Sequence, residues 1–408
     1  MKIKVGVFFG GKSVEHEISI ISALQAIRSL NSDKYEVTPI YITKDNAFYV
    51  GARIGEIEAY RGSIPALLKE SQRVVFVNDG RSVKLLRYPA KAFSKPVVGE
   101  IDVAFPIVHG TNVEDGTLQG FFKMLNLPYV GCDVLSSALG MDKYAMKAVL
   151  KDNGIPVLDC RVFTSAQYDA DNDAVVAAIE GAFGYPVIVK PVNLGSSIGI
   201  SKAGDRAALL DALDTAFCYA AKVLVEPAVQ NLKEINCAVL GDCDDAIPSE
   251  CEEPVNADEI LSFTDKYLGN GKTGAKKTGG SKGMATLSRK IPAEITPEQK
   301  KTIQDYAVKA FQVLGCSGVS RIDFMMDSKT GQIWLNEINT IPGSLSFYLW
   351  EPLGVPYGEL LDRMIALSLK REREQESITY AFDSNVLQGV SFGGGAKGAK
   401  GGSKGGKL

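Results

Sequence analysis

The sequence lacks the features that would tie it to an oxidising compartment, to nucleic acid or to a membrane. Its 7 cysteines are scattered and none forms a C-x-x-C pair, which argues against a disulfide framework or structural zinc and for a reducing compartment. The net charge is −3, so no general attraction to nucleic acid is expected. The sequence has no apolar run long enough to span a membrane and no signal-peptide layout at its N-terminus. These absences predict a cytoplasmic protein without a nucleic-acid or membrane partner.

At 408 residues the chain is too long for one ordinary core, so two or three domains are expected. It opens with a buried-type strand at 2–9, an amphipathic helix with apolar residues from Ile18 to Ile27, and a second strand at 35–43. This β-α-β order predicts a parallel sheet. The predicted boundaries are 1–131, 132–230 and 231–372 for three units.

Two segments are of low complexity. Gly269–Gly283 interrupts the third unit, and the Gly/Lys-rich residues 386–408 form a tail that we expect to be disordered. Both read most simply as solvated linkers, and the alternative for the tail is weak contact with a polyanion.

The stretch GVFFGGKS at Gly6–Ser13 matches the P-loop pattern G-x-x-x-x-G-K-[ST]. A true P-loop places its first glycine where the strand ends, so that the following residues wrap a phosphate. Here Val-Phe-Phe follows that glycine and belongs in a strand core. A helix is expected to begin near Glu15; its N-terminus favours a negative ligand group, and Glu15 favours a positive one. The stretch is therefore either a site for a zwitterion or a plain strand–helix turn with a solvated glutamate.

Several features downstream are compatible with nucleotide binding. Lys143 precedes a helix, and Lys190 ends an apolar strand that leads into the small-residue turn 195–199, whose N–H groups could lie over phosphates. Leu224–Pro227 could offer backbone groups to an adenine, and Glu234 could offer a carboxylate to a ribose. Each signal is weak alone, because strand-end lysines are usually solvated and Gly/Ser hairpins are common.

A predicted hairpin that turns at 329–331 carries a sharper signal. The two-residue period of a strand places Arg321, Asp323 and Met325 on one face. The same period places four residues of the next strand on one face: Ile333, Leu335, Glu337 and Asn339. Asp323 then approaches Glu337 and Asn339, and such hard oxygen donors suit Mg²⁺. Arg321 could stabilise a transferred phosphoryl group or an oxyanion. The alternative is a solvated strand face.

Together these residues resemble the ATP-grasp ligases, and within them the D-alanine–D-alanine ligases. The resemblance covers roughly Lys2 to Lys370. It depends on motifs in a fixed order: GGKSVEHEIS, HGTNVEDGTLQG, MDKYAMK, VIVKPVNLGSSIGISK, FTDKY, SRIDF and NEINTIPG.

The resemblance implies a three-domain ATP-grasp architecture of the α/β class, with α+β character in the ATP-grasp part. The three units become an N-terminal open parallel α/β domain and two ATP-grasp subdomains, the last of which carries a lid at 262–285 and the metal-bearing hairpin. The implied reaction is ADP-forming: ATP drives the joining of two D-alanines to D-alanyl-D-alanine for peptidoglycan precursors, through a D-alanyl phosphate. A homodimer is also expected.

The resemblance also implies roles for individual residues. ATP would be held by Lys143, Lys190, Gly195, Ser197, Gly199, Glu226, Glu234 and Lys266. Two Mg²⁺ or Mn²⁺ ions would be bound by Asp323, Glu337 and Asn339. Glu15 would hold the ammonium of the first D-alanine, Arg321 and the Gly343 N–H would be oxyanion donors, and a trio would join the domains when the lid closes: Glu15, Ser196 and Tyr267.

The segment after Gly343 departs from the family pattern. It reads SLSFYLWEPLG, several residues shorter than usual and without a Ser–Met or Ser–Leu pair at matching spacing. Ser344 and Ser346 are candidates for the carboxylate of the second D-alanine. Tyr267 favours an amino-acid acceptor over D-lactate, and D-serine or another small D-amino acid stays open as acceptor.

His109 ends a buried-type strand just before Gly110. It is either a structural histidine that caps a loop or part of the substrate pocket, and the match to HG…EDGTLQG favours the pocket. A protein that binds nucleotide without catalysis is disfavoured, because a degenerate site would be expected to have lost one of the matching residues.

Overall fold

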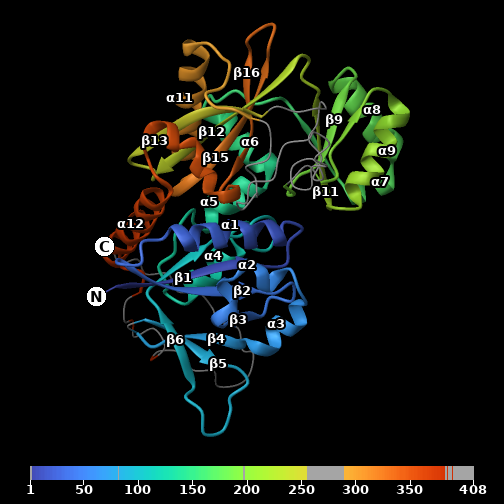
Figure 1. Ribbon diagram of the computed structural model, residues 1–408. Helices are drawn as coiled ribbons and strands as arrows, with labels where there is room; N and C mark the ends of the chain where they lie inside the picture. The colour runs from blue at the N-terminus through green and yellow to red at the C-terminus, as the bar shows by residue number, and fades with distance from the viewer. Residues whose placement is uncertain are drawn as a thin grey trace, which may run out of the picture.

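The computed structural model describes residues 2–80, 82–195, 198–254 and 289–381, together with Ser384 and Gln388. These residues form three sheets of seven, four and five strands, which follow one another along the chain. In Figure 1 the seven-stranded unit lies below, and the five-stranded and four-stranded units lie side by side above it. The predicted lid at 262–285, and the predicted tail apart from Gln388, lie outside the described residues.

The seven-stranded sheet is mixed, with the order β6-β5-β4-β3-β2-β1-β7. Its strands are β1 Ile3–Gly10, β2 Tyr35–Ile42, β3 Phe48–Val50, β4 Gln72–Asn78, β5 Val83–Arg87, β6 Val97–Ile101 and β7 Val103–Pro106. Its helices are α1 His16–Ser29, η1 Ala52–Gly55, α2 Ile57–Tyr60, α3 Ile64–Glu70 and α4 Thr117–Met124. The predicted parallel pairing is confirmed for β1, which pairs in parallel with β2 and with β7. The pairings from β2 to β6 are antiparallel, which corrects the expectation of an open parallel sheet. The β4–β5 link is only a short turn, and parallel pairing requires a long crossover.

A glycine turn connects β1 to α1. Gly10 and Gly11 have φ values of +95° and +94°, which L side chains rarely adopt. A Cβ on Gly10 would lie 2.3 Å from the carbonyl oxygen of Ile42. The His16 ring donates from Nδ1 to the Gly11 carbonyl at 2.6 Å and fixes the turn. The first half of the P-loop pattern lies inside β1, so the stretch is a strand–helix turn that places Glu15 at the N-cap of α1.

The four-stranded sheet has the order β10-β9-β11-β8 and antiparallel pairs. Its strands are β8 Arg161–Thr164, β9 Val187–Pro191, β10 Ser201–Ala203 and β11 Lys222–Pro227, and its helices are α7 Ser165–Ala170, α8 Asn172–Ala182 and α9 Arg206–Phe217. Two helices precede it, α5 Val134–Met141 and α6 Lys143–Asp152. The predicted strand–turn–strand that contains the 195–199 turn is confirmed by the pairing of β9 with β10.

The five-stranded sheet has the order β14-β13-β12-β15-β16. Its strands are β12 Leu232–Gly241, β13 Ala246–Pro254, β14 Arg289–Lys290, β15 Gly318–Asp327 and β16 Ile333–Asn339. The helix α11 Pro297–Val313 begins after Thr296, whose side chain forms the predicted cap. The chain continues through η3 Gly343–Leu349, η4 Glu351–Leu353 and α12 Tyr357–Glu376. None of the helices in the described ranges has the length and apolarity that a bilayer crossing requires.

The expectation that four residues of β16 share one face is wrong. Asp323 pairs with Glu337, but the next residue, Phe324, pairs with Leu335. Asn336 is therefore an extra residue in a β-bulge, which shifts the alternation of side chains along the strand. Leu335 is buried in the core, whereas Glu337 lies on the polar face with Asp323.

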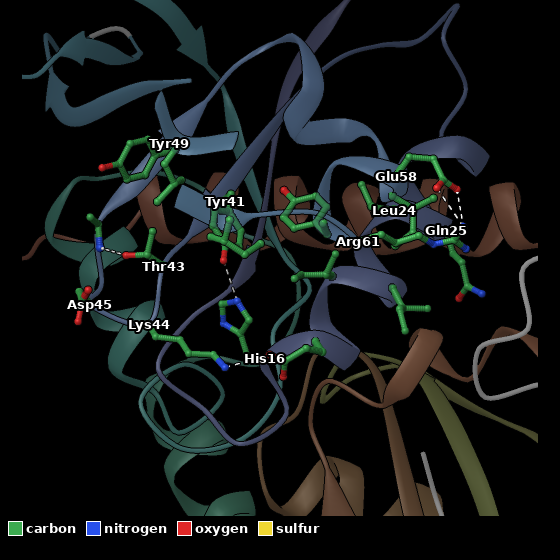
Figure 2. A pocket seen from close by; sticks show the side chains of 18 of the residues that line it. His16, Leu24, Gln25, Tyr41, Thr43, Lys44, Asp45, Tyr49, Glu58 and Arg61 are labelled. Carbon is green, nitrogen blue, oxygen red and sulfur yellow. Dashed lines mark hydrogen bonds and ion pairs between the residues drawn. The ribbon is translucent and has the colours of Figure 1, made fainter. Parts of the chain in front are cut away.

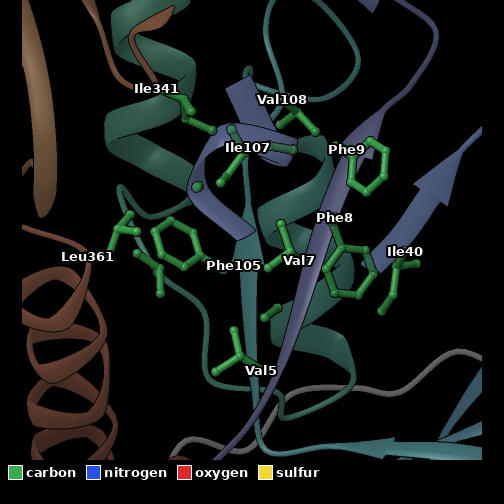
Figure 3. Close-up of a cluster of buried hydrophobic side chains, with 14 of the residues drawn as sticks. Val5, Val7, Phe8, Phe9, Ile40, Phe105, Ile107, Val108, Ile341 and Leu361 are labelled. Atoms are coloured by element: carbon green, nitrogen blue, oxygen red, sulfur yellow. The ribbon is translucent and has the colours of Figure 1, made fainter. Parts of the chain in front are cut away.

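Buried hydrophobic clusters include residues from more than one of the predicted domains. The predicted domain boundaries themselves stay a prediction. Ile341 and Leu361 belong to the same buried cluster as Val5 and Phe105 of the first sheet (Figure 3). Similarly, Met146 of α6 belongs to the cluster under the five-stranded sheet. The last part of the chain therefore fastens the seven-stranded unit to the five-stranded one.

The β1–α1 turn generates a stability prediction. Changing Gly10 to alanine forces a Cβ against a backbone oxygen at an unfavourable φ, and we expect a loss of about 1–3 kcal/mol. Gly62→Ala is the control, since a Cβ there meets nothing within 4 Å. Thermal melting followed by circular dichroism should place Gly10→Ala several degrees below Gly62→Ala; equal melting temperatures would contradict this account of the turn.

Candidate active site

A row of polar side chains crosses four strands of the five-stranded sheet. The strand registers pair Glu252 with Asn236, Asn236 with Asp323, and Asp323 with Glu337. Asn236 donates from Nδ2 to Glu252 Oε1 at 3.0 Å. Residues directly opposite on neighbouring strands share one face of a sheet, so this face gathers several oxygen ligands and needs positive charge beside it.

Arg321 supplies part of that charge. Its Nε and Nη2 atoms donate to the two oxygens of Asp323, each at 2.7 Å. Asn339, opposite Arg321 in the register, donates from Nδ2 to Asp323 Oδ2 at 3.0 Å. Burial alone would lower the pKa of Arg321, but the Asp323 charge outweighs it and raises the pKa well above its ordinary value. The predicted proximity of Arg321, Asp323 and Asn339 is present.

The two predicted nucleotide lysines reach the same hairpin from two different elements, α6 and β9. Lys143, at the start of α6, lies with Nζ 3.2 Å from Glu337 Oε2 and 2.7 Å from the carbonyl oxygen of Leu194. Lys190, in β9, donates to Asn336 Oδ1 at 3.1 Å. Their ammonium groups therefore contact neighbouring residues of β16.

Glu226 lies deeper than the prediction of adenine contact implied. Its side chain is about 1% exposed, and its two oxygens lie 2.5 Å from Lys190 Nζ and 2.6 Å from Lys147 Nζ. Burial would raise the pKa of Glu226, but the two lysine charges outweigh it and hold the pKa below its ordinary value. Its carboxylate is committed to the lysines, and contact of this segment with an adenine stays a prediction.

Three further predicted ATP residues are described and partly exposed. Glu234 of β12 lies opposite Met325, on the same sheet face as Asp323. Gly195 and Gly199 bracket the small-residue turn, and Gly199 has a φ of +71°. The remaining predicted residues lie outside the described part of the chain: Ser196, Ser197, Lys266 and Tyr267.

Glu15 reaches from the first unit to the small-residue turn of the second. A Cβ built on Gly195 or on Gly110 would lie 3.1 Å from Glu15 Oε2, which is tighter than most Cβ contacts, so glycine at both positions leaves room for this carboxylate. The Glu15 side chain is 8% exposed, at the N-terminus of α1. The structure therefore brings Glu15 beside the residue that precedes Ser196.

His109 is a buried link between α1 and the segment after β16. Its Nδ1 lies 2.8 Å from the carbonyl oxygen of Ile341, which can only accept, so Nδ1 carries the proton. Its Nε2 accepts from the Ser22 hydroxyl at 3.1 Å, and that hydroxyl accepts from the Ser344 backbone N–H at 3.1 Å. Burial lowers the pKa of His109. The geometry matches the structural alternative, and a role in the substrate pocket stays a prediction.

The three residues proposed for the oxyanion and the acceptor carboxylate follow β16 directly. Gly343 begins η3, and Ser344 donates from its hydroxyl to Gln25 Oε1 at 2.7 Å. Ser346 is fully buried, and its hydroxyl has no partner among the described residues. Residues 344–346 all have left-handed φ values of 49° to 53°. The Ser346 hydroxyl is therefore buried and unpaired among the described residues, whereas the Ser344 hydroxyl is taken.

The hairpin carries three side chains that could bind a metal ion: Asp323, Glu337 and Asn339. Within the described ranges no group of three His, Cys, Asp or Glu residues could hold one, so the Asn339 amide would have to complete the set of Asp323 and Glu337. Two carboxylates and an amide oxygen are ligands that Mg²⁺ accepts. In this structure the Arg321 guanidinium pairs with the Asp323 carboxylate, where a metal ion would otherwise bind. The donor set fits Mg²⁺ if Arg321 and the amide turn.

A separate cavity of about 1000 Å³ lies in the seven-stranded unit (Figure 2). The described residues that line it fall between His16 and Arg73 and include Leu24, Gln25 and Tyr41. It contains none of the predicted nucleotide or metal residues. Gln25 connects it to the segment after β16, through the hydrogen bond from Ser344.

Sequence reasoning missed several residues that the site depends on: Glu114, Lys147, Asn236, Glu252 and Asn336. Lys147 follows Lys143 by one helical turn, and this i, i+4 spacing is a signal that could have found it. Asn236 and Glu252 could not be found, because the registers of β12 with β15 and of β13 with β12 depend on strand pairing that the local sequence does not show.

Glu114 is a buried carboxyl group that ties two segments together. It accepts hydrogen bonds from Gly110 N at 3.0 Å, Ile341 N at 2.8 Å and the Thr340 hydroxyl at 3.2 Å. Burial, reinforced by the Glu15 charge, raises its pKa from 4.5 to about 7 despite these bonds.

This pKa predicts a pH-dependent stability. The folded state holds the Glu114 proton more tightly than the unfolded state, so the contribution is complete below about pH 4.5 and is lost as the pH rises through about 7. Wild type should lose about 3 kcal/mol over this interval relative to Glu114→Gln. Unfolding midpoints at pH 4.5, 6 and 8 measure the difference, and parallel curves for the two proteins would contradict it.

Comparison with known proteins shows the same architecture. The family model for the D-ala D-ala ligase N-terminus matches residues 4–132, and the model for the C-terminus matches residues 149–366. The D-alanine–D-alanine ligase of Caldicellulosiruptor bescii is 40% identical over 387 residues, which cover 93% of this chain and 99% of that protein.

Two solved structures extend the comparison. The D-alanine–D-alanine ligase from Coxiella burnetii superposes with a TM-score of 0.75 at 30% identity and covers 92% of this chain and 96% of its own. The VanG D-Ala:D-Ser ligase from Enterococcus faecalis superposes with a TM-score of 0.72 at 32% identity and covers 90% of this chain and 100% of its own. The predicted three-unit ATP-grasp fold class and the resemblance drawn from the motifs are confirmed. The chain belongs to the D-alanine–D-alanine ligase family.

Proposed function

We propose that the protein joins two D-alanines to D-alanyl-D-alanine at the expense of ATP, which becomes ADP and phosphate. The observation that carries this proposal is the convergence of Lys143, Lys190 and Arg321 on the oxygen ligands of β15 and β16. A polyanionic nucleotide needs such cations, and membership of the ligase family supports the reaction. The dipeptide would serve peptidoglycan precursor synthesis in the cytoplasm, and the protein would act as a homodimer.

ATP would lie between the four-stranded and five-stranded sheets. Lys143 and Lys190 would contact its phosphates, and the turn at 195–199 would cover them with backbone N–H groups. Glu234 would bind the ribose, and Lys266 would reach the phosphates from the lid. Asp323, Glu337 and Asn339 would hold two Mg²⁺ or Mn²⁺ ions, which offset the charge of the phosphates and orient them.

The first D-alanine would lie at the N-terminus of α1. Glu15 would pair with its ammonium group, and the helix N-terminus favours its carboxylate. The neutral His109 contributes no charge there; it fixes α1 against residues 341–344. The proposed trio of Glu15, Ser196 and Tyr267 would close the lid over the site and keep water from the reactive intermediate.

The reaction has two steps because a carboxylate is too poor an electrophile for an amine. A carboxylate oxygen of the first D-alanine attacks the γ-phosphorus, the bond to ADP breaks, and an acyl phosphate forms. The amine of the second D-alanine, after losing a proton, attacks the carbonyl carbon. Arg321 and the Gly343 N–H stabilise the oxyanion. The C–O bond then breaks, and phosphate leaves with the original carboxylate oxygen.

A second acceptor, D-serine, is favoured by one observation. The 344–346 segment is short and left-handed, and its buried Ser346 hydroxyl is unpaired among the described residues. The VanG relative is named as a D-Ala:D-Ser ligase.

Purified protein with Mg²⁺ and ATP tests these alternatives directly. We expect phosphate release with D-alanine alone and a D-alanyl-D-alanine product by mass spectrometry. D-alanine mixed with D-serine should report any mixed dipeptide, and L-alanine is the negative control. No ATP turnover with any amino-acid pair would favour a nucleotide-binding protein without ligase activity.

Two substitutions test the assigned chemistry. Glu15→Ala removes the partner of the substrate ammonium, and Arg321→Ala removes the oxyanion donor; each should lower kcat/KM by about 10²–10³-fold or more. Matched controls are Glu17→Ala and Arg363→Ala, since both side chains are exposed and paired at the surface. Ligase rates near wild type in either test variant, with melting temperatures unchanged, would refute its assigned role.

A further inference from the structure

A lysine that the proposed mechanism does not use lies buried behind the nucleotide lysine. The Lys147 side chain in α6 is 3% exposed. Its Nζ lies 2.6 Å from Glu226 Oε2 and 3.3 Å from the carbonyl oxygen of Leu158. The other Glu226 oxygen lies 2.5 Å from Lys190 Nζ. One buried carboxylate thus bridges two ammonium groups.

The arrangement places a surplus of positive charge where the nucleotide is proposed to bind. Two lysines and one glutamate sum to one positive charge if all are ionised, away from water. Burial lowers the pKa of Lys147, and the Glu226 charge opposes that shift. Lys190 divides its donors between Glu226 and Asn336 Oδ1. The second cationic partner of Glu226, Lys147, therefore also influences how strongly Glu226 attracts Lys190 away from Asn336 in β16.

The spacing along α6 explains why Lys147 can do this. Lys143, Lys147 and Lys151 recur every four residues and follow one face of the helix. Lys143 reaches Glu337, and Lys147 reaches Glu226. Lys151, whose side chain is 69% exposed, pairs with Asp159 at the surface. The helix thus directs two consecutive lysines into the site and carries the third into solvent.

We propose that Lys147 is a positioning residue for ATP: it neutralises one oxygen of Glu226, so that the Lys190 ammonium stays directed toward Asn336 and the phosphates. Without Lys147, Glu226 has only Lys190 as a cationic partner and draws it away from the nucleotide. The proposal rests on the proposed function in one respect, namely that Lys190 contacts the nucleotide. Lys147 itself touches neither substrate nor metal.

Fluorescent mant-ATP titration and steady-state kinetics on the full chain test this role. Lys147→Met should raise the mant-ATP Kd and the KM for ATP by at least about tenfold, the scale of loss when a binding group is misplaced. The KM for D-alanine should change less than twofold. Lys147→Arg should restore most of the affinity, because guanidinium can also pair with Glu226. Lys151→Met is the matched control and should behave as wild type.

A double-mutant cycle separates positioning from mere stability. If Lys147 acts through Glu226, adding Lys147→Met to Glu226→Gln should change the mant-ATP Kd less than twofold, even if Lys147→Met alone is too unstable to study. A tenfold further loss on the Glu226→Gln background would overturn the proposal. So would a Lys147→Met protein that melts lower but binds mant-ATP as wild type does. Wild-type protein that binds no mant-ATP would instead contradict the proposed function.

Discussion

Neutralisation of acidic side chains on one sheet face is the constraint on which the site depends. Asp323 and Glu337 lie opposite each other on neighbouring strands, where like charges repel. Arg321 neutralises the first and Lys143 the second. The five-stranded unit and helix α6 must meet here to satisfy this requirement, and their meeting forms part of the proposed nucleotide site. A cation that binds the same carboxylates would release Arg321 for the oxyanion.

A second constraint is the connection between α1, which follows Glu15, and the segment after β16. Ser344 N–H, Ser22, His109 and the Ile341 carbonyl form one continuous run of hydrogen bonds. Because every donor in it has an acceptor, the run is a fixed link across the interface of two units. The shared core behind it, in which Ile341 packs with the first sheet, keeps α1 and Glu15 in register with the segment after β16.

The sequence predicted local structure and chemistry better than long-range pairing. The P-loop match failed because Val-Phe-Phe belongs to a strand, and Thr296 was found because its capping pattern is local. The bulge at Asn336 was missed, because the prediction assumed a regular two-residue period along the strand and an inserted residue breaks that period. Lys147 had a local signal in its i, i+4 spacing from Lys143, but its contact with Glu226, like that of Glu114 with Ile341, joins residues distant in the chain. Long-range contacts of this kind leave no trace in a single sequence.

The central claim is that the first amino acid is activated by phosphorylation of its carboxylate. D-alanine labelled with ¹⁸O in both carboxylate oxygens tests this claim most directly, with the released phosphate analysed by ³¹P nuclear magnetic resonance. The account predicts one ¹⁸O atom in each phosphate released, because the carboxylate oxygen that attacks the γ-phosphorus leaves with it. Phosphate that is released together with dipeptide but carries no ¹⁸O would contradict the acyl phosphate and the roles assigned to the residues around it.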